Sequence, residues 1–123
     1  MKVRGVRGAT TADANDRESV MSATGDLLRT MITQNGIESD DLAAVQFTTS
    51  PDLVAEFPAV AAREQLGWKH VPLLNAVEID RPGAQPLCIR ILMFWNTDRA
   101  QNEIKHVYLK GAVNLRADLA SAQ

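Results

Sequence analysis

One apolar stretch, Leu87 to Trp95, constrains the fold of this chain more than any other part of its 123 residues. Its length and its β-branched and aromatic residues predict a strand in the interior of a sheet. Alternation along a strand places two sets of side chains on opposite faces. These sets are Ile89, Ile91, Met93 and Trp95 on one face, and Cys88, Arg90, Leu92 and Phe94 on the other. Arg90 therefore interrupts an apolar face with a permanent charge.

The charge of Arg90 has three explanations. Burial of an unpaired guanidinium would cost on the order of several kcal/mol, so the charge must have a reason. It pairs with an internal carboxylate, or it reaches the rim of the sheet along its aliphatic stem, or it is held for an anionic ligand. The strand alone does not choose among these.

The remaining elements alternate between strands and helices. Helical spacing of apolar residues predicts a helix over 16–34, with Asn15 as its N-cap and Asn35-Gly36 as its stop. Pro58 and Gly67 bound a second, short helix. Further strands are expected at 2–9, 43–49, 71–74 and 106–109, with a polar loop at 10–15, a turn at 81–83 and a short C-terminal tail. The fold class is α+β, with a mixed β-sheet and two helices of ferredoxin-like type. We expect one domain over residues 1–123.

Composition excludes several classes of protein. The net charge of −2 gives no basic field for nucleic acid or an anionic membrane. Cys88 is the sole cysteine, so an internal disulfide is impossible, and with His70 and His106 it forms no zinc-binding pattern. Cys88 instead has the setting of a buried apolar residue. Without a recognisable signal peptide, the expected location is the cytoplasm.

Polar residues within apolar segments are the candidate functional residues. Arginines outnumber lysines nine to four, and a guanidinium offers a fork of donors that suits carboxylates and phosphates. Besides Arg90, the candidates in apolar settings are Arg7, Arg63, Glu78, Tyr108 and Arg116. Together they predict a pocket for a small polyanion. The sequence has no nucleophile elbow, phosphate-binding loop or dinucleotide fingerprint.

The chain resembles the small monofunctional chorismate mutases of the bacillary type, from Val3 to about Leu119. The most specific segments are Arg4-Gly5-Val6-Arg7-Gly8-Ala9-Thr10-Thr11, Phe57-Pro58-Ala59, Ala62-Arg63, Val71-Pro72, Cys88-Ile89-Arg90, His106-Val107-Tyr108-Leu109, Leu115-Arg116 and Asp118-Leu119. The resemblance implies a homotrimer that forms a pseudo-α/β-barrel, with active sites at the subunit interfaces. It implies conversion of chorismate to prephenate, a step toward phenylalanine and tyrosine, with no cofactor and no metal.

The resemblance also implies roles for individual residues. Arg90 would meet the ether oxygen and side-chain carboxylate of chorismate, Arg7 would bind a carboxylate, and Tyr108 would donate at the same end. Glu78 would accept from the ring hydroxyl, near Leu74 and Asn75. Phe57, Ala59, Leu73 and Leu115 would form an apolar wall, and Arg63 and Arg116 would lie at the mouth. Phe57 and Arg63 are expected to come from the adjacent subunit.

Two positions and the C-terminus depart from the family pattern. Val60 stands where a relative has lysine, and Asn75 stands where the same relative has cysteine. Loss of a cation at the mouth would weaken carboxylate attraction only modestly, because exposed charges are screened. The chain after Leu119 is short and consists of Ala-Ser-Ala-Gln. Two alternatives remain: a non-catalytic module that binds small carboxylates, and a trimeric imine deaminase.

Overall fold

The strand that contains Arg90 is the central strand of a five-stranded sheet. In the computed structural model, which describes residues 1–118, this strand is β4 (Cys88–Thr97). It pairs antiparallel with β1 (Lys2–Thr11) on one side and with β2 (Leu42–Thr49) on the other. At the edges, β3 (Leu73–Val77) runs parallel to β2, and the short β5 (Val107–Tyr108) runs parallel to β1. The α+β fold with a mixed sheet is therefore confirmed.

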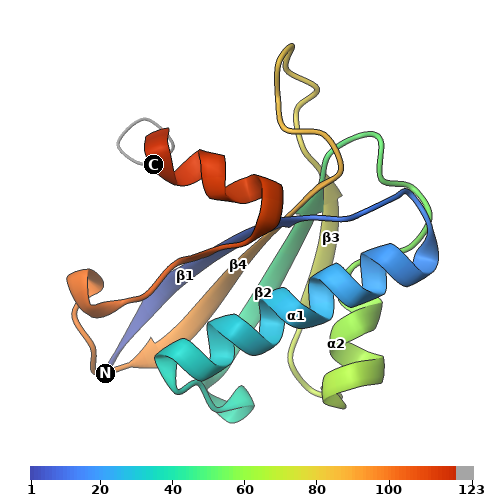
Figure 1. Cartoon of the computed structure of the whole chain (residues 1–123). Helices are drawn as coiled ribbons and strands as arrows, with labels where there is room; N and C mark the ends of the chain where they lie inside the picture. Colours follow the sequence, from blue (N-terminus) through green and yellow to red (C-terminus); the bar gives the residue numbers. More distant parts are fainter. Residues whose placement is uncertain (119–123) are drawn as a thin grey trace.

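Two helices, α1 (Arg17–Asn35) and α2 (Ala59–Leu66), cover one face of this sheet (Figure 1). The face of β4 beneath them is the apolar set predicted from alternation, with exposures between 0% and 5% at Ile89, Ile91, Met93 and Trp95. On β1, Gly8 brings α1 close, because a side chain at this position would collide with Met31. The core thus lies between the helices and one face of the sheet.

The helix ends are set by local hydrogen bonds and by backbone shape. Asp16, and not Asn15 as predicted, is the N-cap of α1, since its carboxylate accepts from the backbone N–H of Ser19. Asn15 instead accepts from the backbone of the segment at Val54. Gly36 ends α1 and Gly67 ends α2, both in the left-handed conformation that favours glycine.

Several segments differ from the sequence-based expectation, including the strand expected at 106–109, which is limited to Val107–Tyr108. The predicted loop at 10–15 begins two residues late, because β1 continues to Thr11. The strand expected at 71–74 lies at Leu73–Val77, where the backbone of β2 provides its partners. The C-terminal tail forms a 3-10 helix, η3 (Lys110–Asp118), and two short 3-10 turns, η1 (Ser39–Asp41) and η2 (Gln101–Glu103), also occur. None of the described helices has the length and apolar character needed to cross a membrane.

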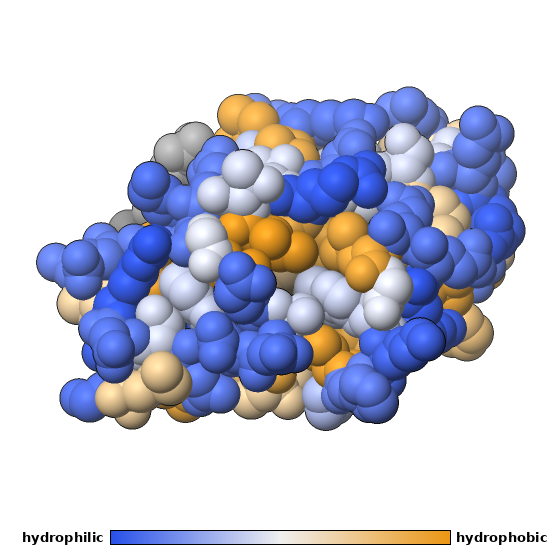
Figure 2. Space-filling model, turned by 90° about the horizontal axis from the view of Figure 1, so that it is seen from below, coloured by the Kyte–Doolittle hydropathy of each residue, from blue (hydrophilic) through white to orange (hydrophobic). Residues whose placement is uncertain are grey.

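Large apolar side chains are exposed around the β3 edge of the sheet. Exposures reach 77% at Val54, 64% at Phe57, 61% at Leu74, 69% at Val77 and 86% at Ile79. Apolar side chains also gather near the middle of the otherwise mostly hydrophilic lower surface (Figure 2). Exposed apolar patches of this kind mark interaction surfaces.

A fully buried amide connects the end of α1 to the segment before β5. The Asn35 amide donates to the backbone carbonyls of Met31 and Lys105, and its oxygen accepts from the Lys105 N–H. The side chain is 0% exposed and uses both its donor and its acceptor groups. Asn35 thus fixes the chain immediately before His106.

Replacement of Asn35 by leucine should lower the free energy of unfolding by about 2 kcal/mol, because it strands polar backbone groups at Lys105. Urea unfolding followed by circular dichroism measures the change. The matched control is Gln34→Leu at the neighbouring exposed position, which should change stability by less than about 0.5 kcal/mol. Equal stability of the two variants would contradict the role given to Asn35.

Candidate active site

The face of the sheet that α1 and α2 leave open carries Arg90 in a row of residues that crosses every strand. Register pairs Arg90 with Thr48 on β2 and with Ala9 on β1. Thr48 in turn pairs with Ala76 on β3, and Ala9 pairs with Tyr108 on β5. Directly opposed residues point to the same face. The sheet itself therefore fixes the place of Arg90, with neighbours on both sides.

A second row, one step along the strands, brings Arg7 to the same face. Arg7 pairs with Leu92, which pairs with Gln46, which pairs with Leu74. Arg7 and Arg90 both line a hollow of about 410 Å³, together with Gly8, Gln46, Thr48, Ala76, Val77, Glu78, Ile79, Ile91 and Leu92. Two guanidinium groups at one hollow suit an anion with more than one charged group.

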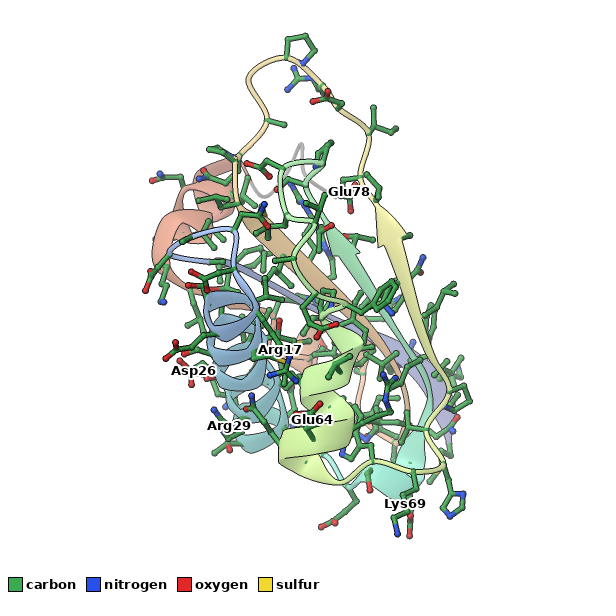
Figure 3. All side chains as sticks on the ribbon, turned by 90° about the vertical axis from the view of Figure 1, so that its right-hand side faces the viewer. Arg17, Asp26, Arg29, Glu64, Lys69 and Glu78 are labelled. Atoms are coloured by element: carbon green, nitrogen blue, oxygen red, sulfur yellow. The ribbon has the colours of Figure 1, made fainter. Side chains whose placement is uncertain are left out.

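Glu78 enters this hollow from the end of β3 (Figure 3). Its backbone N–H donates to the carbonyl of Thr49, which extends the strand pairing by one bond. Its carboxylate accepts from the Thr48 hydroxyl at 2.5 Å and lies 4.0 Å from the Arg90 Nε. The carboxylate is thus held beside Arg90 by a hydroxyl of the neighbouring strand.

The environment of Arg90 differs from that assumed in the sequence argument. Its face of β4 is open, and the Arg90 side chain is 32% exposed. The charge is therefore not buried without a partner, and the large burial penalty does not apply. The pairing with Glu78 is at the 4.0 Å limit of an ion pair, so it leaves the guanidinium able to take further acceptors.

Tyr108 lies at the far end of the Arg90 row, under η3. It packs with Ala9, Ala112 and Leu115 and is 7% exposed. Its hydroxyl is buried and makes no hydrogen bond to any of the described residues. Tyr108 does not line the hollow of Arg7, Glu78 and Arg90, so the described structure does not bring it together with them.

Other predicted residues lie apart from this hollow. Phe57 and Asn75 line a separate hollow of about 320 Å³ between the start of α2 and β3. The Asn75 side-chain oxygen accepts from the Ala59 N–H at 3.0 Å, so Asn75 holds the first turn of α2. Ala76 and Val77 line both hollows, and β3 therefore separates them.

The remaining predicted site residues differ in how far their side chains are buried. Ala59 is completely buried, whereas Arg63 one turn later is exposed, so their shared helix face does not form one pocket. Leu73 packs against the core, and Leu74 is exposed on the open face. Arg116 belongs to η3, but its side chain lies outside the described part, as does Leu119.

A carboxylate fixes the loop that joins Glu78 to β4. Asp52 accepts from the backbone N–H of Leu87, a residue with φ of 50°, and from the Ser50 hydroxyl. Ser50 in turn accepts from the Cys88 N–H at 2.8 Å. The bond from Ser50 lowers the pKa of the Asp52 carboxyl from its ordinary value. Figure 1 shows this loop extending away from the sheet.

Cys88 is a core residue, as predicted. It is 2% exposed, and burial raises the pKa of its thiol against the opposing effect of Arg90. A raised pKa keeps the thiol protonated and a poor nucleophile. Among the described residues, no three histidine, cysteine or acidic side chains are close enough to hold a metal ion.

Sequence reasoning missed Thr48, Gln46 and His106 as neighbours of the candidate residues. The alternation of β2 places Thr48 and Gln46 opposite its buried positions, and this was the available signal. No pattern in the sequence indicates that His106 contacts Arg7, because this contact arises only when β5 pairs with β1.

The fold and the open face define a class: a small α+β protein with an arginine-lined hollow on the open face of its sheet. Comparison with known proteins identifies the family. The model of the family "Chorismate mutase type I" matches residues 3–119. The chain is 52% identical to chorismate mutase AroH of Thermus thermophilus over 122 residues, which covers 98% of this chain and 99% of that protein. It is 41% identical to chorismate mutase AroH of Bacillus subtilis over 120 residues, with coverage of 98% and 94%.

A solved structure agrees with the sequence relatives. A chorismate mutase from Clostridium thermocellum superposes with a TM-score of 0.87 at 44% identity, covering 89% of this chain and 97% of that one. The chain belongs to the type I chorismate mutase family. The resemblance inferred from the sequence is thereby confirmed.

Proposed function

We propose that this chain converts chorismate to prephenate in the hollow lined by Arg7, Glu78 and Arg90. A chorismate mutase is an isomerase, and this reaction class follows from membership in the family. The observation that carries the choice of site is the position of Arg90, which the central strand holds on the open face beside Arg7 and Glu78.

The reaction needs little from the protein except position and charge. Chorismate carries two carboxylates, an ether bridge and a ring hydroxyl. Its rearrangement breaks the ether carbon–oxygen bond and forms a carbon–carbon bond within the same molecule, so no external nucleophile, metal or cofactor takes part. Negative charge develops on the ether oxygen, because the old bond breaks ahead of the new one. A guanidinium fixed at that oxygen stabilises the transition state more than the ground state.

The other residues have complementary roles in this proposal. Arg7 binds a carboxylate, and Glu78 accepts from the ring hydroxyl while the Thr48 hydroxyl keeps it in place. Tyr108 is given the role of donor to the substrate carboxylate, and this role requires its hydroxyl, which is buried in the single chain, to become accessible at the site. Together these contacts bind chorismate in the compact conformer from which it reacts.

The proposal includes a homotrimer with its sites at the interfaces. Two observations support it: the hollow at Phe57 and Asn75 is separate from that at Arg90, and apolar side chains are exposed along the β3 edge between them. In the proposed trimer, Phe57 and Leu115 contribute the apolar wall and Arg63 and Arg116 the mouth, while Ala59, which is completely buried, and Leu73, which packs against the core, support that wall from behind. Leu74 and Asn75 lie nearby, and Asn75 acts by holding α2 rather than as a direct donor. We place the trimer in the cytoplasm.

A spectroscopic assay tests this function. Chorismate absorbs in the ultraviolet and prephenate much less, so purified protein should cause a steady loss of absorbance, whereas Arg90→Ala protein should not. Binding of chorismate by calorimetry without loss of absorbance would support the carboxylate-binding alternative and contradict the proposal. Release of ammonia from an imine substrate would support the deaminase alternative.

A further inference from the structure

A histidine outside the Arg90 hollow makes a bond that bears on Arg7. The backbone N–H of Arg7 donates to the Nδ1 of His106 at 3.0 Å. Strand β5 consists of Val107 and Tyr108, so its pairing with β1 ends at Gly8, one residue after Arg7. The imidazole therefore supplies the acceptor that a backbone carbonyl would supply if β5 were longer.

We propose that His106 is a positioning residue for the reaction: its neutral imidazole holds Arg7 in place at the end of the β1–β5 pairing, and its protonation releases Arg7. The inference rests on the proposed role of Arg7 in binding chorismate. It adds to that function a residue that touches no substrate and a dependence on pH.

The chemistry of imidazole explains this dependence. An imidazole nitrogen accepts a hydrogen bond only when it carries no proton, so the bond from Arg7 requires neutral His106 with its proton on Nε2. Protonation at Nδ1 would turn the acceptor into a donor that faces another donor. It would also place a second positive charge beside the Arg7 guanidinium.

The surroundings of His106 favour the neutral form. Burial, and secondarily the charge of Arg7, lower the pKa of His106 from its ordinary value of 6.5. His106 and Arg7 border a hollow of about 550 Å³ with Gly5, Leu92, Gln101, Asn102 and Ile104. Leu92 from β4, Gln101 and Asn102 from η2, and Ile104 after η2 are all uncharged. Arg7 is therefore the charged group that faces His106 in this hollow.

The backbone immediately before His106 is held in place by the buried side chain of Asn35. Asn35 bonds to both the N–H and the carbonyl of Lys105, as described above. The imidazole thus starts from a backbone that is fixed at Lys105, and from there it accepts the hydrogen bond of the Arg7 N–H. A rigid support of this kind lets one hydrogen bond determine a position.

The test compares three variants over pH 4.5 to 8. In His106→Asn, the side-chain oxygen occupies the place of Nδ1 and accepts at every pH, whereas His106→Leu has no acceptor. Arg7→Ala measures what Arg7 itself contributes. For each protein, kcat and KM for chorismate are measured, and circular dichroism and thermal melts report the fold.

We expect the kcat/KM of the unmodified protein to fall as pH drops through the lowered pKa of His106, below pH 6.5. His106→Asn should keep its activity through that fall, because its side-chain oxygen accepts at every pH. Titration of the substrate and of other groups affects both proteins equally, so the difference between the two profiles reports His106. His106→Leu should lose about tenfold in kcat/KM at pH 7.5, mainly through a higher KM. Its kcat/KM should not show the further decrease below pH 6.5 that is assigned to His106. A profile for His106→Asn identical to that of the unmodified protein would overturn the inference.

A second measurement does not depend on activity. In a His70→Gln background, ¹⁵N NMR of the remaining histidine should show Nε2 protonated and Nδ1 unprotonated at pH 7.5. The opposite tautomer would overturn the inference, even if His106→Leu failed to fold. The proposed site and this inference fail in different ways. Full activity of Arg7→Ala would contradict the role of Arg7, whereas inactive Arg7→Ala with fully active His106→Leu would contradict only the role of His106.

Discussion

Replacement of Arg90 by alanine should lower kcat for chorismate by about three orders of magnitude and leave the fold intact. The first effect follows from the loss of a donor aimed at a charge that develops in the transition state. The second follows from the position of Arg90 on the open face, where its side chain is 32% exposed and only loosely paired with Glu78. Turnover is measured from ultraviolet absorbance, and stability from a thermal melt.

Arg90→Lys refines this prediction. Lysine keeps the charge but lacks the planar fork, so it cannot meet the ether oxygen and a carboxylate together. We expect some substrate binding to remain while most of the turnover is lost, as for an interaction made mainly in the transition state. Arg29→Ala, on the exposed side of α1, is the control and should retain full activity. A destabilised Arg90→Ala protein together with a fully active Arg90→Lys protein would give Arg90 a structural role instead.

Two inactive variants should restore one another when their subunits mix. Arg90→Ala damages the Arg90 hollow, and the double variant Phe57→Asp/Arg63→Glu places acids on the wall and at the mouth that a neighbour provides. Each protein alone should have less than about 1% of full activity. After joint unfolding and refolding at equal amounts, about a quarter of the interfaces in a cyclic trimer combine two intact halves. Activity of the mixture should therefore rise to about a quarter of the unmodified level.

The matched control mixes Arg90→Ala with Glu78→Gln. Both changes lie in the same hollow, so every interface contains one damaged half and activity should not recover. Analytical ultracentrifugation of each sample checks that trimers form. A fully active monomer, or a first mixture no more active than its parents, would contradict shared sites at the interfaces.

The sequence predicted the elements whose side chains alternate between core and surface. In β4 the odd-numbered residues from Ile89 to Trp95 proved to be the core face, because burial against α1 and α2 requires that pattern. The limits of β3 were less predictable. It is an edge strand with Leu74 and Val77 exposed, so its extent depends on pairing with β2 and not on its own hydrophobicity.

The candidate site could be predicted only in part. Arg7, Glu78 and Arg90 are polar residues in apolar segments, and this local contrast is visible in the sequence. Whether the face that carries Arg90 is covered is a property of the whole sheet, so alternation alone could not settle it. The role of Asn75 could not be predicted either. Its side-chain oxygen accepts from the Ala59 N–H, which lies on another element, and no residue near position 75 indicates this bond.

The loop between Glu78 and Leu87 offers a place for protein engineering. Both of its ends are fixed from outside the loop, by the Thr49 carbonyl at Glu78 and by the Asp52 carboxylate at Leu87. Between these anchors, Arg81, Pro82 and Gly83 are exposed, and Gly83 has a φ of 82°. Closure entropy rises only slowly with loop length. A peptide tag or a small reporter domain grafted at Pro82 could therefore be carried without moving Glu78 or Arg90.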